Sequence, residues 1–198
     1  MNKCLNVIGI VLALLLFPYC SGERAQRSEG QGSSAHAALA EIDSLMWRRA
    51  DSAFVLLQEF VVSPEAKELD TYDEHYCQVL ISELLYKNEY EQTNREALLD
   101  AVAYFDSLTA NIHGVFQQKL KVFLDARAHY INGVGFNKQG NVVQACEEYL
   151  KALEIMEVHF KDEELIGKKA IFMTYIYNRL MELFSGQFMM NPAITCGE

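Results

Sequence analysis

Residues 133–141 (GVGFNKQGN) form the stretch of this sequence that most nearly matches a nucleotide-binding loop. Gly135 and Gly140 have the spacing of the two glycines in a P-loop, whose backbone N–H groups cradle phosphates. That loop also needs a Lys and a Ser or Thr to hold phosphate and magnesium, but Asn141 and Val142 occupy these positions. A P-loop must follow a β-strand, whereas residues 123–136 carry apolar side chains at helical spacing. The sequence therefore predicts no nucleotide here.

Residues 73–77 (DEHYC) are the densest run of potential metal ligands. On a helix, His75 and Cys77 point to different sides, so they cannot share a metal ion without a distant third ligand. We expect a polar rim beside a buried Cys77 and no metal site. Cys77 and Cys146 are expected to be small buried hydrophobic residues, because the spacing of the cysteines does not form a disulfide framework.

Two further histidines, His129 and His159, lie in the stretch with the clearest helical pattern, and either could reach a ligand in a groove. We expect both to be surface or half-buried residues that are satisfied by hydrogen bonds. Four carboxylates on the intervening helix are expected to form a solvated face: Glu147, Glu148, Glu154 and Glu157. The sequence contains no Gly-x-Ser-x-Gly motif and no cysteine with a recognisable histidine partner. It therefore predicts a protein that is not an enzyme, with no catalytic residues, metal or cofactor.

The composition favours a folded, acidic protein. With 198 residues, of which 51% are hydrophobic, the chain can bury one sizeable core or a short array of stacked units. The formal net charge is −10. This charge argues against a nucleic-acid partner, because nucleic-acid binding depends on neutralising phosphates with Lys and Arg.

Residues 1–20 are typical of an export signal. Lys3 precedes an apolar run over residues 7–17, which is shorter than the roughly 20 residues that a transmembrane helix needs. Cys20 follows this run and resembles the lipidated cysteine of a bacterial lipoprotein, although the bulky Tyr19 stands where a small residue is favoured. An ordinary signal cleaved nearby and an uncleaved anchor are the alternatives. Each places the protein in a cell envelope, and lipidation or anchoring would attach it to a membrane.

The rest of the chain divides into a tether and a helical domain. Residues 21–36 are rich in Ser, Gly and Gln and are expected to be disordered. From residue 37 to residue 198, apolar side chains recur at helical spacing without strand-like alternation. The pattern predicts two short helices before a break at Pro64 and a loop at residues 111–114. The longer predicted helices span residues 71–87, 95–108, 119–138, 141–160 and 165–188.

Small and aromatic residues alternate at fixed spacing along residues 133–152: Gly133, Phe136, Gly140, Ala145, Tyr149 and Ala152. This order resembles the tetratricopeptide repeat, a hairpin of two antiparallel helices. The resemblance implies that Gly133, Ala145 and Ala152 allow close helix packing, that Phe136 and Tyr149 fill the space between helices, and that Gly140 forms the turn. His129 and Asn132 depart from the pattern, since they stand where the family usually has Trp and Leu.

The spacing repeats in weaker form at the end of the chain, in Tyr177, Leu180, Phe184 and Ala193. Phe188 replaces the turn glycine, while Asn191 and Pro192 are expected to begin a new helix. Alanines 53, 101, 145 and 193 also recur at long, nearly regular intervals. We therefore expect an all-α, TPR-like solenoid of about three and a half hairpins, in which the last repeat is cut short. The apolar residues Leu180, Phe184 and Phe188 would then lack a packing partner.

The leader and the degenerate repeats together resemble the N-terminal part of bacterial envelope TPR proteins. Stacked hairpins form extended concave surfaces, which bind proteins or peptides. The resemblance thus implies a non-catalytic interaction scaffold of the bacterial envelope with a protein or peptide partner in its groove. The alternative is a truncated remnant of a longer envelope signalling or regulatory protein, without independent activity.

Overall fold

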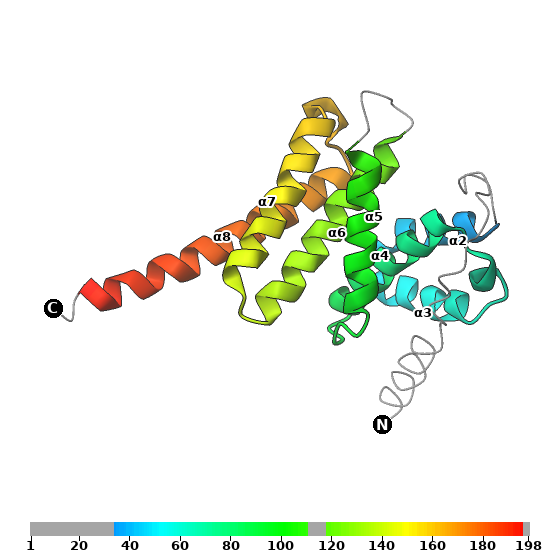
Figure 1. The fold of residues 1–198 in the computed structure, drawn as a ribbon, viewed down its shortest axis with the longest axis horizontal. Helices are drawn as coiled ribbons and strands as arrows, with labels where there is room; N and C mark the ends of the chain where they lie inside the picture. The colour runs from blue at the N-terminus through cyan, green and yellow to red at the C-terminus, as the bar shows by residue number, and fades with distance from the viewer. Residues whose placement is uncertain (1–33, 111–117, 196–198) are drawn as a thin grey trace. The chain divides into compact units, whose positions relative to one another are not determined.

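A computed structural model describes the backbone of residues 34–110 and 118–195 and the side chains of residues 34–110 and 118–186. Figure 1 shows that this part of the chain is built from α-helices. They are α2 (Ser34–Met46), α3 (Ala50–Val61), α4 (Thr71–Lys87), α5 (Arg95–Thr109), α6 (Lys119–Lys138), α7 (Val142–His159) and α8 (Lys168–Thr195). Two short 3-10 helices, η1 (Glu65–Glu68) and η3 (Asp162–Glu164), lie between the α-helices, and no strand occurs in the described residues. The all-α prediction is confirmed.

Several helix bounds agree with the sequence pattern, but α2 begins at Ser34, so the expectation of disorder is wrong for residues 34–36. The predicted helices over residues 71–87 and 119–138 have the bounds of α4 and α6. Asp70 begins α4 by accepting a hydrogen bond from the backbone N–H of Asp73 at 2.9 Å, which satisfies one of the free donors at a helix N-terminus. Pro64 lies before η1, where a proline is compatible with the start of a helical turn.

The chain divides into two compact units, Met1–Asp100 and Ala101–Glu198, and α5 crosses the boundary between them. In the first unit, α2 packs against α3, and α4 packs against both. Its buried core contains Leu39, Ile42, Met46, Ala53, Leu57, Phe60, Leu80 and Leu84. Each helix therefore directs its apolar stripe toward the others, as the periodicity predicts.

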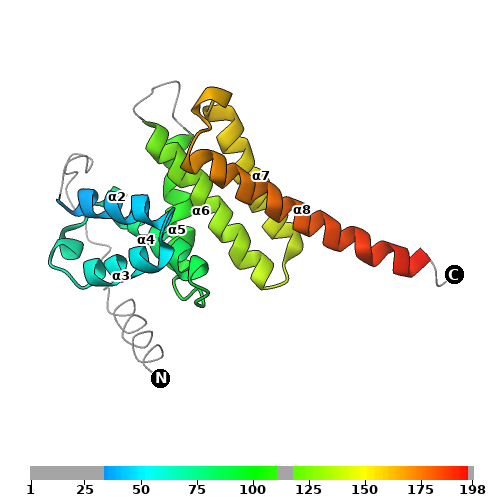
Figure 2. The same ribbon diagram turned by 180° about the vertical axis from the view of Figure 1, so that it is seen from behind.

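In the second unit, α6 packs along α7, and α7 packs against α8. Figure 1 and its reverse view, Figure 2, both show α6 and α7 as a hairpin with α8 beside them. Aromatic rings fill the space between these helices. The Phe172 ring of α8 makes edge contacts with the rings of Phe123 and Tyr130 of α6, with 5.4 Å between ring centroids in each pair. The ring centroids of Tyr130 and Tyr149 of α7 are 5.6 Å apart. Tyr149 is fully buried, whereas Phe136 is only half-buried.

Gly133 is the point of closest approach between α6 and α7. A Cβ atom at this position would lie 2.7 Å from Cε1 of Tyr149 and 3.2 Å from the carbonyl oxygen of Ala145. Ala145 and Ala152, on the facing side of α7, are fully buried. A small residue is therefore required at position 133, where the two helices come closest.

The turn between α6 and α7 depends on Gly140, whose φ of 75° is unfavourable for residues with a Cβ atom. Asn141 stands at the N-cap of α7, but its side chain makes no capping hydrogen bond. The Asn141 amide instead donates to the side chain of Gln144. The predicted turn is therefore correct in position, although the expected side-chain cap is absent.

The predicted break near residues 188–192 is wrong. Helix α8 continues to Thr195, so Asn191 and Pro192 lie within it and do not begin a new helix. Phe188 holds the place that a turn glycine would take and cannot adopt positive φ as readily as Gly140 does. Ala193 consequently belongs to α8 and not to a second helix, and its side chain lies outside the described residues.

We predict that Gly133→Ala destabilises the protein. Gly→Ala in a helix ordinarily stabilises by up to about 1 kcal/mol. At Gly133, however, the new methyl group would overlap the buried Tyr149 ring, and overpacking of this kind costs about 1–3 kcal/mol. The midpoint of urea denaturation should therefore fall.

Gly186→Ala is the matched control. Gly186 also lies in a helix, but a Cβ atom there would meet nothing within 4 Å. This variant should leave the urea midpoint unchanged or raise it. Equal midpoints for the two variants would contradict the close approach at Gly133.

Candidate functional site

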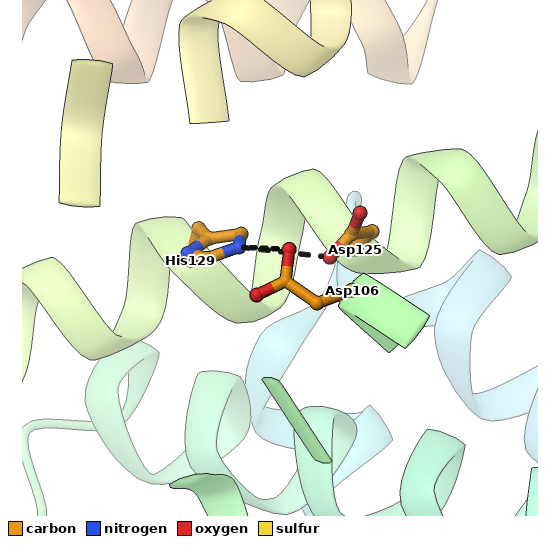
Figure 3. A group of neighbouring side chains, drawn as sticks. All are labelled: Asp106, Asp125 and His129. Carbon is orange, nitrogen blue, oxygen red and sulfur yellow. Dashed lines mark hydrogen bonds and ion pairs between the residues drawn. The ribbon is translucent and has the colours of Figure 1, made fainter. Parts of the chain in front are cut away.

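A buried polar cluster in the second unit places three carboxylates around one imidazole. His129 and Asp125 lie one turn apart on α6, Asp106 lies on α5 and Glu148 lies on α7. Figure 3 shows the Asp106 carboxylate directed toward His129 and Asp125. His129 and Asp125 are among the few buried polar residues of this unit, at 5% and 0% exposure. Buried charges require partners, so the cluster must be explained as a unit.

Both ring nitrogens of His129 face carboxylates. Nδ1 lies 2.7 Å from Oε2 of Glu148, which is a short hydrogen bond. Nε2 lies 3.3 Å from Oδ1 of Asp106 and 3.7 Å from Oδ1 of Asp125. The Nδ1 contact fixes the orientation of the ring, whereas Nε2 faces two carboxylates at longer distances.

The Asp125 carboxyl group is only partly satisfied. Thr109, at the end of α5, donates its hydroxyl hydrogen to Oδ2 of Asp125 at 2.5 Å. Oδ1 is buried and has no hydrogen-bond partner. Burial raises the pKa of Asp125 to about 6, and the charge of Asp106 adds to the rise. The Thr109 hydrogen bond and the charges of His129 and Lys151 lower the pKa but do not offset the burial.

The His129 imidazole is held in an environment that favours its charged form. Burial alone would lower its pKa, but the hydrogen bond and charge of Glu148 act in the opposite direction. The charges of Asp125 and Asp106 reinforce Glu148, and the net effect raises the pKa above its usual value. The cluster therefore concentrates negative charge around a single imidazole.

The cluster is partly accessible to solvent. The Asp106 side chain is 46% exposed and that of Glu148 is 21% exposed, whereas those of His129 and Asp125 are 7% and 1% exposed. Asp106, Asp125 and His129 each offer one ligand atom, and these atoms lie within 4.8 Å of one another. Within residues 34–110 and 118–186, these three residues form the group of His, Cys, Asp or Glu side chains that is close enough to hold a metal ion.

The stretch over residues 73–77 does not form a comparable group. Asp73 is buried and pairs with Nδ1 of His36 at 2.6 Å. Cys77 is buried, as expected, and burial raises the pKa of its thiol to about 12. Cys146 is half-buried and only partly fits the same expectation. Burial lowers the pKa of His75, so this imidazole is neutral near pH 7.

The expectation for the four glutamates is wrong at Glu148, because its carboxylate binds His129 and does not face solvent alone. The histidine itself carried a signal in the sequence. His129 stands where the repeat family usually has a large apolar residue, and a polar side chain in a packed position needs buried partners. Asp125, four residues earlier, lies on the same helix face. Asp106 and Thr109 carried no comparable signal.

An exposed apolar stripe runs along α8. Tyr177, Met181 and Phe184 recur at spacings of four and three residues and are 46%, 64% and 49% exposed. Tyr177 and Phe184 therefore do not pack in the core, and the exposure of Phe184 agrees with the expectation that it lacks a packing partner. Tyr177 donates a hydrogen bond to Oε1 of Glu157 at 3.3 Å. Leu180 is buried, at 6% exposure, so the expectation that it lacks a partner is wrong.

The predicted lipidation site at Cys20 lies outside the described residues. Among the residues that the structure describes, no helix is long and apolar enough to cross a membrane.

We predict that Asp125→Asn changes how stability depends on pH in chelator-treated protein. The folded-state pKa of Asp125 is about 6 and its ordinary value is 3.8. Because the folded state binds this proton more tightly than the unfolded state does, protonated Asp125 stabilises the fold, and this contribution is fully present below pH 3.8. This contribution is lost as pH rises through the folded-state pKa. Asn carries no charge, so the variant should gain stability relative to wild type between pH 4 and 7, by up to about 3 kcal/mol. Chemical denaturation across this pH range measures the difference.

Thr109→Val serves as the complementary variant. It removes the hydrogen bond that lowers the Asp125 pKa, so the loss of stability should move to higher pH. A difference between wild type and Asp125→Asn that stays constant from pH 4 to 7 would contradict a raised pKa.

Comparison with known proteins found no matching family model, no matching curated protein and no matching solved structure.

Proposed function

We propose that this protein is a non-catalytic scaffold that binds a protein or peptide through its TPR-like hairpins. The α6–α7 hairpin supports the repeat assignment, because Gly133 and Ala145 permit close packing and Gly140 forms the turn with positive φ. An array of such hairpins presents long, continuous helix faces to partners.

The observation that carries this proposal is the exposed stripe of Tyr177, Met181 and Phe184 on α8. Exposed apolar side chains that adjoin one another mark interaction sites more often than isolated ones do. Leu180 and Leu183 of the same helix are buried, so among the described residues one part of the apolar surface of α8 is covered and the stripe is not. A helix of this kind is suited to pack another helix on its free face.

The partner that fits best is an amphipathic helical segment with basic flanks. Its apolar residues would cover Met181 and Phe184, and its basic residues would meet the acidic surface of a chain with net charge −10. Glu154 and Glu157 on α7 are exposed and could provide part of that acidic surface.

We also propose that the protein is exported to a bacterial cell envelope and tethered to a membrane through Cys20. The apolar run over residues 7–17 and the cysteine that follows it support this location. Mass spectrometry of the mature protein should find a new N-terminus at Cys20 that carries a diacylglyceryl group. A mature N-terminus at another residue would contradict the tether.

The exposed stripe also supports a second candidate, a remnant of a longer repeat protein without independent activity. In that case Met181 and Phe184 would pack against a second copy of the chain or leave it unstable. Thermal melting beside a version extended by a complete further helix distinguishes the candidates. A large rise in melting temperature supports the remnant, and equal melting temperatures contradict it.

We predict that a photo-reactive amino acid at position 181 of the full chain crosslinks to an apolar helical segment of another protein. Met181→Ser combined with Phe184→Ser should weaken binding of that segment more than tenfold, because each lost apolar contact is worth about 1.5–3 kcal/mol when fully buried. Ile166→Ser is the matched control, since Ile166 is 72% exposed but lies before α8, away from the stripe.

Three outcomes separate the possibilities. A crosslink from position 181, but not from position 166, to a different protein supports the scaffold. A crosslink to a second copy of this chain supports the remnant. An equal yield from positions 181 and 166 overturns the role of the stripe.

A further inference from the structure

Asp106, Asp125 and His129 have the spacing of ligands around one metal ion. Nε2 of His129 lies 3.3 Å from Oδ1 of Asp106 and 3.7 Å from Oδ1 of Asp125. Ligands bound tetrahedrally at about 2.1 Å from a zinc ion would be roughly 3.4 Å apart. The contact with Asp106 is a hydrogen bond and the contact with Asp125 is too long for one, and both distances are close to those expected for atoms that share a metal.

The second observation is independent of this spacing. Oδ1 of Asp125 has no hydrogen-bond partner, and water cannot replace one because the side chain is only 1% exposed. The Thr109 hydroxyl binds the other oxygen and so holds the carboxylate with Oδ1 turned toward His129. Native proteins rarely leave a buried carboxylate oxygen unsatisfied, because the cost of removing it from water is not recovered. A cation at this point would satisfy it.

The surroundings of His129 match those of histidines that bind metals. Such histidines usually donate their other ring N–H to a carboxylate, which orients the ring and makes it a stronger ligand. Glu148 accepts in this way at Nδ1, at 2.7 Å, and leaves Nε2 directed toward the two aspartates. An ordinary buried histidine needs only one such partner.

The charge of the cluster also favours a cation. Asp106, Asp125 and Glu148 lie around one imidazole, and apart from that imidazole the positive charge that acts on Asp125 is Lys151. Lys151 itself pairs with Glu154 at 3.6 Å and is 45% exposed. Asp106 is partly exposed, so an ion could enter from its side of the cluster and retain water molecules as additional ligands.

We propose that Asp106, Asp125 and His129 bind a divalent first-row transition ion, with Glu148 and Thr109 as positioning residues. One imidazole nitrogen and two carboxylate oxygens suit Zn²⁺, Co²⁺, Mn²⁺ or Fe²⁺ better than Mg²⁺ or Ca²⁺, which prefer oxygen ligands alone. The ion would join α5 to α6 and stabilise the second unit. This proposal is independent of the scaffold function and of its partner.

The test uses the full chain without a histidine tag, first treated with a chelator and then titrated with Co²⁺ and Zn²⁺. Co²⁺ should produce visible absorption bands at one equivalent, and calorimetry should give one Zn²⁺ site per chain. Saturation at 100-fold excess over Kd raises stability by about 2.7 kcal/mol, which a thermal melt detects. Mg²⁺ at the same concentration should have no comparable effect.

Variants locate the site. Asp125→Asn removes a charged ligand but keeps the side-chain shape and the contact with Thr109, and it should abolish the Co²⁺ bands. Glu148→Gln should weaken affinity about 10- to 100-fold without changing the stoichiometry, as expected for a partner of a metal-bound histidine. Circular dichroism verifies that each variant is folded, and Glu148→Gln keeps the test decisive if Asp125→Asn unfolds.

Asp73→Asn is the matched control, because Asp73 is an equally buried carboxylate that pairs with a histidine, His36, but lies outside the group of three ligands. Its metal affinity should equal that of the wild type. Absence of Co²⁺ bands and of a Zn²⁺ effect on melting would overturn the proposal. Full binding by the Asp125→Asn and Glu148→Gln variants would also overturn it, because the ion would then occupy another site.

Discussion

The second unit depends on the close packing of α6 against α7 at Gly133. The Tyr149 ring occupies the space that a Cβ atom on Gly133 would need. The small side chains of Ala145 and Ala152 are fully buried and allow α7 to lie close to α6. A side chain one methyl larger at position 133 would separate the two helices. The same pairing holds Glu148, the neighbour of Tyr149, against His129 one turn before Gly133. Apolar packing thus sets the geometry of the polar cluster.

The cluster has an energetic cost that packing alone does not explain. A buried histidine with three carboxylates costs more free energy than an apolar side chain would at the same position. A bound cation accounts for the orientation of Glu148, the Thr109 hydrogen bond and the unsatisfied Oδ1 of Asp125 together. Each of these features would otherwise need its own explanation.

The exposed stripe of α8 and the polar cluster belong to the same unit but have opposite properties. The stripe is apolar and open to solvent, and it gains free energy when a partner removes it from water. The cluster is charged and mostly enclosed, and it gains free energy when a cation balances its charge. An ion that joins α5 to α6 would stiffen the hairpin on which α8 packs, so that metal and partner could act on one scaffold without sharing a site.

The sequence by itself determined the local features. Apolar spacing, Pro64 and Gly140 placed the helices and turns, because these signals act within about four residues along the chain. Tertiary structure alone decided the rest. Asp106 and His129 are 23 residues apart in the sequence, and their side chains meet only because the fold brings them together. Packing likewise buried Leu180, exposed Tyr177 and turned Glu148 inward, since burial depends on which helices lie alongside and not on the order of residues within one helix.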